Sequence, residues 1–229
     1  MIEQVFHRLW LGPRPMPQAF RDYGQKWEQL NPGWQVHDWS WHDLPEDLAN
    51  LDVMDDLRNR CSSGNSIELP TQLADIIDYE LVYRFGGIYL NADIQPVRAL
   101  PAEMTDGRAW ASLEDDHTGA VVNAAFGAPA GHPFFKAVVE ELPRRYWHLR
   151  QQGVQEMNQL TGPWLLTDAH RNVPGLHVFP HTAFNPVHWG RIGFGHNADG
   201  LWRLEDLPPE TVGVHHWHHR KAQRTNIVH

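Results

Sequence analysis

The stretch 70–94 constrains the fold most strongly, because a helical pattern, a glycine stop and an alternating strand follow one another within it. Apolar side chains recur at three-and-four spacing up to a Gly-Gly pair, which predicts a helix over 70–85. Gly86-Gly87 supplies the left-handed conformation that helix ends favour. The segment 88–94 then alternates between apolar and polar residues, which predicts a strand whose carboxyl end opens into a site. The polar face of that strand carries Tyr89, Asn91 and Asp93.

The rest of the chain alternates between short apolar runs and longer polar runs, separated by Pro and Gly. This order predicts an α/β fold with a single domain over 1–229. A polar loop is expected at 61–66, and Pro143 can interrupt a long helix. The expected strands are 5–11, 34–39, 110–113, 120–127, 177–179 and 212–217, and the expected helices are 18–30, 132–150 and a short helical or loop segment after Thr161-Gly162-Pro163.

Composition and charge narrow the class of protein. A formal net charge of -9 argues against binding to nucleic acid or anionic membrane through long-range attraction. Cys61 is the only cysteine, so no intrachain disulfide can form and a reducing cytoplasm is the expected location. No run of eighteen apolar residues occurs, and the first residues lack a signal pattern, so neither a membrane span nor a targeting segment is predicted.

Five motifs follow one another along the chain: Phe6-His7-Arg8-Leu9-Trp10-Leu11-Gly12, Ala74-Asp75-Ile76-Ile77, Arg84-Phe85-Gly86-Gly87-Ile88-Tyr89-Leu90-Asn91-Ala92-Asp93, Thr161-Gly162-Pro163 and Val214-His215-His216-Trp217. In this order and spacing they resemble glycosyltransferase family 32, the sugar transferases with a DXD motif. The resemblance implies a GT-A fold, a nucleotide-sugar-binding α/β sandwich with a mixed, mainly parallel sheet. It also implies transfer of a hexose-like sugar, with retained configuration, from a UDP- or GDP-linked donor to a glycan or other hydroxyl acceptor.

The resemblance also implies a divalent cation, Mn²⁺ or Mg²⁺, at the centre of catalysis. Asp93 occupies the second acidic position of the DXD motif and is the expected direct ligand. Asn91 stands at the first acidic position, where its amide oxygen can coordinate without adding negative charge; a strand-end Asn that satisfies the backbone is the alternative. His215 resembles the late His that completes the metal shell, and His216 is its competitor, because adjacent strand residues point to opposite faces.

Five residues besides Asn91 are expected on the donor side. Trp10 resembles the residue that stacks the nucleobase, although a plain core Trp is the alternative. Asp75 resembles the aspartate that holds donor-sugar hydroxyls, and Tyr89 shares a strand face with Asp93. Lys221 can reach the diphosphate or simply lie in solvent. Asp78 departs from the family, which has Arg there, and the reversed charge puts the usual donor contact in question.

Two other classes of function compete with transfer. The replacements at Asn91 and Asp78 are compatible with a protein that binds a nucleotide sugar without turning it over. Water in place of the acceptor would give a nucleotide-sugar hydrolase. A structural zinc site is disfavoured, because the His cluster 215–219 lacks a separated second ligand pair. Acceptor-side groups or a base are expected among Asp115, Asp116 and Asp168.

Overall fold

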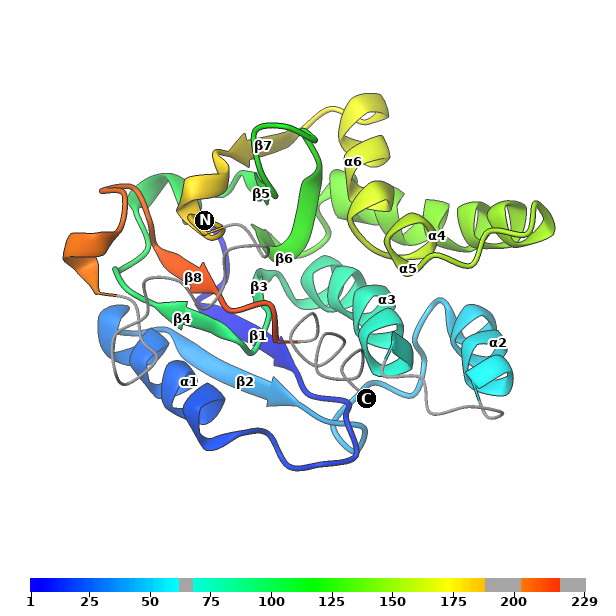
Figure 1. Ribbon diagram of the computed structural model, residues 1–229, viewed down its shortest axis with the longest axis horizontal. Coiled ribbons are helices and arrows are strands. Elements are labelled where there is room, and N and C mark those ends of the chain that lie inside the picture. The colour runs from blue at the N-terminus through cyan, green and yellow to red at the C-terminus, as the bar shows by residue number, and fades with distance from the viewer. Residues whose placement is uncertain (62–67, 188–202, 219–229) are drawn as a thin grey trace, which may run out of the picture.

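A computed structural model of the chain describes residues 1–61, 68–187 and 203–218. Figure 1 shows their arrangement. The elements are β1 (Val5–Leu9), α1 (Gln18–Leu30), β2 (Gln35–Trp39), α2 (Leu51–Cys61), α3 (Glu68–Phe85), β3 (Gly87–Leu90), β4 (Ile94–Pro96), η1 (Ala102–Met104), β5 (Ala109–Leu113), β6 (Val121–Ala128), α4 (Pro133–Gln151), α5 (Met157–Leu160), α6 (Pro163–Asn172), β7 (Leu176–Phe179), η2 (His181–Ala183), η4 (Leu204–Asp206) and β8 (Gly213–His215).

The central sheet has six strands in the order β2-β1-β3-β6-β5-β7. β1 pairs in parallel with both β2 and β3, and β5 pairs in parallel with β7. β6 is antiparallel to both of its neighbours, β3 and β5. The other five strands therefore share one direction, as the expected mixed, mainly parallel sheet requires. Their carboxyl ends lie at one edge, and β6 begins at that same edge.

Apolar side chains cover both faces of this sheet. On one face, Leu9, Tyr89 and Phe126 belong to a core that includes residues of α2, α3, α4 and α6. On the other face, Phe6 and Ile88 belong to a core that includes residues of α1, β4 and the chain just before β8. Figure 1 shows the same division, with α2 to α6 on one side of the sheet and α1, β4 and β8 on the other. The strand alternation expected from the sequence thus separates two apolar layers.

The predicted strand 88–94 is not one strand. β3 ends at Leu90, a turn closed by a hydrogen bond from Ile94 N to Asn91 O (3.0 Å) follows, and β4 resumes at Ile94. β4 pairs with β8 in a separate two-stranded sheet, and Pro96 is the last residue of β4. The predicted final strand 212–217 is correspondingly shortened to the three residues of β8. Asn and Asp favour turns, which explains the break at the end of the six-stranded sheet.

Two other expectations were wrong. The loop expected at 61–66 does not begin at Cys61, because Cys61 is the last residue of helix α2. This helix was not among the expected ones and buries Val53, Met54 and Leu57, and residues 62–66 lie outside the described residues. Pro143 does not interrupt α4. A proline cannot donate to the carbonyl four residues earlier. In α4 the carbonyl of Val139 instead accepts a hydrogen bond from Nδ2 of Asn50 (3.2 Å).

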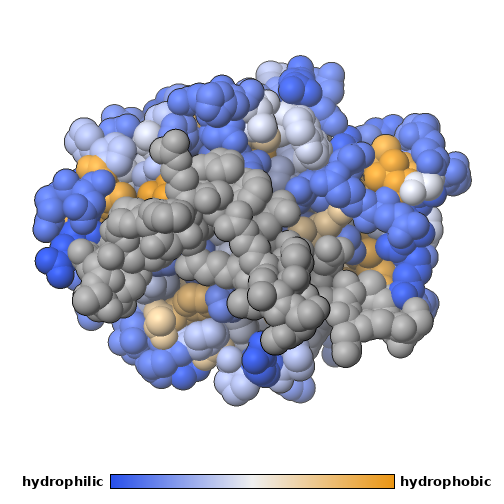
Figure 2. Space-filling model, in the orientation of Figure 1, coloured by the Kyte–Doolittle hydropathy of each residue, from blue (hydrophilic) through white to orange (hydrophobic). Residues whose placement is uncertain are grey.

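The surface facing the viewer in Figure 2 is mostly hydrophilic where it is coloured, and its hydrophobic side chains gather in small, separate patches. Among the described residues, none of the helices combines the length and the apolar character that crossing a bilayer requires.

Candidate active site

Polar side chains from distant parts of the chain meet at the carboxyl edge of the six-stranded sheet. Asn91 follows β3 directly, and its N–H still donates to the carbonyl of Ala124 in β6 (2.8 Å). Asp93 lies in the turn between β3 and β4, and His215 ends β8, which pairs with β4. In that pairing Ile94 lies opposite His215, so the short second sheet brings the late histidine beside the turn.

Asn91, Asp93 and His215 converge on one point. Nε2 of His215 lies 3.3 Å from Oδ1 of Asp93 and 3.3 Å from Nδ2 of Asn91. His215 and Asp93 are buried, with 2% and 7% of their surface exposed. The second carboxylate oxygen of Asp93 accepts a hydrogen bond from the backbone N–H of His218 (2.7 Å), so Oδ1 is the oxygen that faces the histidine.

The hydrogen bonds of Asn185 decide which nitrogen of His215 carries a proton. Nδ2 of Asn185 donates to the carbonyl of Leu113 (3.0 Å), and its Oδ1 therefore faces Nδ1 of His215 (3.3 Å). An amide oxygen only accepts, so Nδ1 carries the proton, and Nε2 of the neutral imidazole presents its lone pair to Nδ2 of Asn91, 3.3 Å away. The same nitrogen also lies 3.3 Å from Oδ1 of Asp93.

This arrangement fits a divalent cation. A nitrogen lone pair and a carboxylate oxygen 3.3 Å apart repel each other unless a proton or a cation lies between them. Imidazole, carboxylate and amide oxygen are ligands that Mn²⁺ accepts, and the bond from Nδ1–H to Asn185 is the outer contact that orients a ligating His. Across the described ranges, no three His, Cys, Asp or Glu side chains form a metal-binding group. Asp93 and His215 are thus the two side chains of these types that the described residues bring together here.

His216 points away from this cluster, as the expected alternation of the pair requires. Its Nε2 lies 3.0 Å from Oε1 of Gln95 and 3.5 Å from the hydroxyl of Tyr23, and its ring stacks on Tyr23. Burial, together with the nearby carboxylate of Asp93, raises the pKa of Tyr23 to about 12. His216 therefore ties α1 to β4, while His215 faces Asp93.

Asp75 lies in a buried polar network beside the metal candidates. Its Oδ1 accepts from Nδ2 of Asn123 in β6 (2.8 Å), and its Oδ2 accepts from Oγ1 of Thr161 (2.9 Å). Burial raises the pKa of Asp75 to about 7, although both hydrogen bonds act to lower it. A side chain at Gly162 would place its Cβ 3.3 Å from Oδ2 of Asp75. In the Thr-Gly-Pro sequence, Thr161 thus supplies a hydrogen-bond donor to Asp75, and Gly162 allows the backbone to lie close to that carboxylate. Pro163 is the first residue of α6.

Asp78 lies one turn further along α3 and is fully buried. Its Oδ1 has no hydrogen-bond partner. Burial, followed by the neighbouring charge of Asp75, raises the pKa of Asp78 well above its ordinary value and so favours the neutral carboxyl. The sequence predicts a reversed charge at this position, but burial opposes the negative charge of Asp78. The change from the family's Arg is therefore mainly the loss of a cationic side chain.

Tyr89 and Trp10 complete the described donor-side candidates. The hydroxyl of Tyr89 donates to Oδ1 of Asn91 (3.1 Å), and burial followed by the charges of Asp78 and Asp75 raises its pKa well above the ordinary value. The hydroxyl therefore stays a donor. Trp10, just after β1, is partly exposed; its Nε1 donates to the carbonyl of Arg14 (2.6 Å) and its ring meets Phe20 edge-on.

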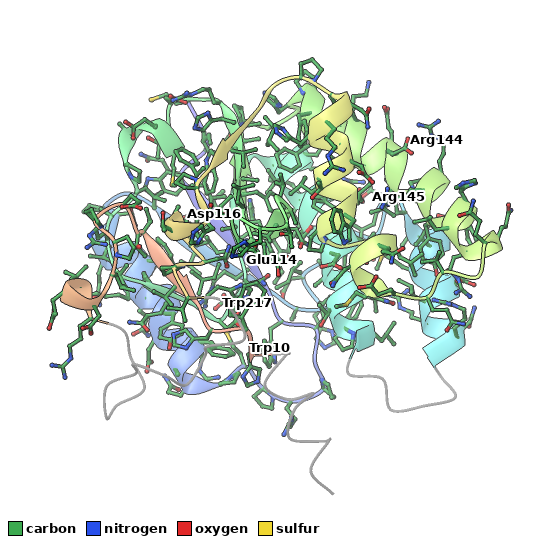
Figure 3. All side chains as sticks on the ribbon, turned by 45° about the horizontal axis from the view of Figure 1, so that its top comes forward. Trp10, Glu114, Asp116, Arg144, Arg145 and Trp217 are labelled. Carbon is green, nitrogen blue, oxygen red and sulfur yellow. The ribbon has the colours of Figure 1, made fainter. Side chains whose placement is uncertain are left out.

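The remaining candidates are dispersed. Asp115 closes a turn by accepting from the backbone N–H of His117 (2.7 Å), and Asp116 lies 3.2 Å from Nε2 of His181. Asp168 forms an ion pair with Arg145 and lines a cavity of about 690 Å³ between α4 and α6. Figure 3 shows Trp10, Trp217, Glu114 and Asp116 in one region and Arg144 and Arg145 apart from them on α4. Lys221 lies outside the described residues.

Three residues of the site escaped sequence reasoning. Asn123 is a polar position in an apolar strand, and that contrast is a signal that could have identified it. Asn185 is a single Asn in an irregular segment, so no pattern distinguishes it. Trp217 follows the His pair in the late motif, and its backbone has a φ of 53°. No sequence signal indicates this conformation, because Trp seldom adopts positive φ.

Residues 17–115 match a family model described as a glycosyltransferase sugar-binding region containing a DXD motif. The family resemblance is confirmed over these residues. The matched region contains Asp75, Asp78, Tyr89, Asn91 and Asp93, whereas Trp10 and His215 lie outside it. A DXD motif has two aspartates separated by one residue, whereas the matched region has Asn91 and Asp93 at these two positions.

Two curated proteins share sequence with most of the chain. Inositol phosphoceramide mannosyltransferase 3 of Schizosaccharomyces pombe is 25% identical over 183 residues, which are 79% of this chain and 49% of that protein. Lactosylceramide 4-alpha-galactosyltransferase of Rattus norvegicus is 26% identical over 171 residues, which are 68% of this chain and 42% of that protein. The chain thus spans less than half the length of each relative.

Solved structures confirm the expected GT-A fold. A structure described as PaToxG glycosyltransferase aligns with a TM-score of 0.55 at 14% identity, over 76% of this chain and 70% of that one. The UDP-bound glycosyltransferase domain of the YGT toxin aligns with a TM-score of 0.50 at 9% identity, over 78% and 79% of the two chains. At these identities the likeness concerns the fold.

Proposed function

We propose that this chain transfers a hexose-like unit, with retained configuration, from a nucleotide-diphosphate sugar to a hydroxyl acceptor, and that the transfer depends on a divalent cation. The observation that carries the proposal is the meeting of Asn91, Asp93 and His215 at the carboxyl edge of the sheet. Two ligands of suitable type, the carboxylate of Asp93 and the imidazole of His215, converge there beside the amide of Asn91, within a family known by its sugar-binding motif.

Each side chain has a distinct task in this proposal. Asp93 and His215 hold the cation, and Asn185 keeps the lone pair of His215 aimed inward. Asn91 adds its amide oxygen as a ligand once the amide turns, because its nitrogen faces His215 in this structure. A bound cation neutralises the charge that develops on the departing nucleoside diphosphate. The protonated hydroxyl of Tyr89 keeps Asn91 in place through its hydrogen bond.

The donor is expected along the same edge. The ring of Trp10, fixed by the bond from Nε1 to Arg14, offers a partly exposed surface on which a base can stack. Asp75 uses one lone pair of each carboxylate oxygen for Asn123 and Thr161, so each oxygen retains a second lone pair for a sugar hydroxyl. The relatives are named for mannose and galactose transfer to ceramide-based acceptors, which supports a hexose donor and a hydroxyl-bearing acceptor.

A donor panel tests the proposal directly. UDP- and GDP-linked hexoses are incubated with the protein and Mn²⁺, Mg²⁺ or EDTA, and release of nucleoside diphosphate is measured with and without oligosaccharide and glycosylated ceramide acceptors. We expect release that requires the cation and increases with an acceptor. Product linkage, read by NMR, reports whether the anomeric configuration is retained.

Variants and rival outcomes sharpen this test. Asp93→Ala should reduce turnover on the order of 100-fold or more, because it removes the charged ligand. Asp55→Ala, an exposed position on α2, is the matched control and should leave turnover unchanged. Full cation-dependent turnover in Asp93→Ala would overturn the proposal. Release that no acceptor stimulates would favour a hydrolase, and a donor that raises the melting temperature without being consumed would favour a binding protein.

A further inference from the structure

Trp217 has an unusual backbone conformation beside the cation candidates. Its φ is 53°, and it is the one non-glycine residue with positive φ in the ranges that the structure describes. Bulky side chains rarely adopt the left-handed region, and such residues persist where their surroundings require them. The strained residue is also buried, with 6% of its surface exposed.

The left-handed turn at Trp217 wraps the chain around Asp93. Before the turn, the N–H of His216 donates to the backbone carbonyl of Asp93 (3.2 Å). After the turn, the N–H of His218 donates to Oδ2 of the same residue (2.7 Å). Because the φ and ψ angles of Trp217 together set where the following N–H points, this conformation fixes one carboxylate oxygen and leaves Oδ1 facing His215.

The indole of Trp217 acts on His215 at the same time. The two rings stack with centroids 4.2 Å apart and planes 30° apart. Nε1 of Trp217 is 3.4 Å from the carbonyl of Val187, to which it donates. Asn185 holds the edge of the imidazole through Nδ1, and the indole covers its face. The imidazole is thereby held on two sides with Nε2 directed at Asp93.

We infer that Trp217 is a positioning residue: its left-handed backbone orients the carboxylate of Asp93, and its indole orients the imidazole of His215. The part of this inference that concerns cation affinity rests on the proposed function. The orientation of the two side chains does not, because it is a property of the protein without a cation.

Three substitutions separate the backbone from the ring. Trp217→Gly tolerates positive φ but removes the indole. Trp217→Phe keeps an aromatic ring at the same strained φ, and Trp217→Ala removes the ring while the strain remains. Trp147→Ala, a partly exposed Trp on α4, is the control for loss of an indole elsewhere.

The first measurement uses ¹⁵N-histidine NMR without metal, with the signals of His215 assigned from a His215→Gln sample. We expect the Nδ1-protonated form in the wild type, because Asn185 accepts from that nitrogen. Trp217→Phe should retain this form, whereas Trp217→Gly and Trp217→Ala should show mixed tautomers once the imidazole can rotate. Unchanged signals in both of the latter variants would overturn the inference.

The second measurement is Mn²⁺ affinity by calorimetry, without donor or turnover. We expect affinity within about twofold of wild type for Trp217→Phe and Trp147→Ala, about tenfold weaker binding for Trp217→Gly, and still weaker binding, to about 100-fold, for Trp217→Ala. Wild-type affinity in Trp217→Ala would overturn the inference. If wild-type protein binds no Mn²⁺, the cation site of the proposed function fails instead, and the tautomer measurement alone decides the role of Trp217.

Discussion

The amide nitrogen of Asn91 lies 3.3 Å from Nε2 of His215. The opposite end of the same amide accepts from the hydroxyl of Tyr89 (3.1 Å). Asn91 thus stands at the first acidic position of the motif and links β3 to β8 without a charge of its own. The cluster around His215 consequently contains one carboxylate, that of Asp93, where a DXD motif would provide two.

Asn91→Asp should strengthen cation binding. The substitution adds a second carboxylate of nearly the same shape, and hard divalent cations prefer charged oxygen ligands. We expect Mn²⁺ affinity to rise about tenfold, which corresponds to about 1.4 kcal/mol. Calorimetry checks the affinity, and cation-dependent release of nucleoside diphosphate checks its effect on turnover. Asn172→Asp, on exposed α6, should change neither. Weaker Mn²⁺ binding in Asn91→Asp would contradict this arrangement of ligands.

Asp78→Asn should stabilise the protein at alkaline pH. The pKa of Asp78 is raised by burial and by Asp75, so the folded state binds a proton that the unfolded state has lost. Stability therefore falls as the pH rises above about 4, the ordinary pKa of an Asp. A neutral amide removes that dependence.

We expect Asp78→Asn to gain roughly 1–3 kcal/mol at pH 8 and much less at pH 4. Urea unfolding at the two pH values measures the difference. Asp55→Asn, at an exposed position, should show no such gain. An equal effect at both pH values would show that ionisation of Asp78 is not what the substitution relieves.

Thr161→Val should destabilise the protein more at pH 8.5 than at pH 5. The hydroxyl of Thr161 donates to Oδ2 of Asp75, whose pKa burial raises to about 7. Below that pH the acceptor is neutral and the bond contributes about 1 kcal/mol, whereas above it the acceptor is charged and the bond contributes about 2 kcal/mol. Losing the donor also raises the pKa of Asp75 further, so stability falls more steeply as the pH rises.

Thermal unfolding at pH 5 and pH 8.5 measures this difference, and Thr161→Ser, which keeps the hydroxyl, should restore most of it. A pH-independent loss in Thr161→Val would mean that packing of the threonine, and not its bond to Asp75, is the cause.

The helix and glycine stop at the centre of the sequence could be predicted because their signals are local. α3 ends at Phe85, and Gly86 and Gly87 have φ values of 65° and 90°. A side chain at Gly87 would place its Cβ 2.6 Å from the backbone oxygen of Val5. Positive φ and close packing both require glycine at this point, so the Gly-Gly pair in the sequence is enough to predict the end of the helix.

The turn at 91–93 could not be predicted, because alternation survives when a strand leaves one sheet and joins another. Ile88 and Ile94 are both buried in the same core, although β3 and β4 belong to different sheets. The meeting of Asn185 with His215 depends on tertiary contacts of an irregular segment and has no periodic signature. The metal candidates could be named from motifs, whereas the residues that orient them required the structure.

Gly24→Ala should destabilise the protein, although Ala is the better helix former by about 1 kcal/mol in an exposed helix. The Cβ would lie 2.5 Å from Nη2 of Arg8 and 2.8 Å from its Cζ. The guanidinium cannot retreat easily, because it is buried and bonded to both carboxylate oxygens of Asp38 and to the carbonyl of Phe20. We expect a loss of roughly 1–3 kcal/mol in urea unfolding, since overpacking forces the neighbours to shift. Gln25→Ala, on the exposed face of α1, should be neutral or slightly stabilising. A gain in Gly24→Ala would show that α1 can move away from β1 without loss of these bonds.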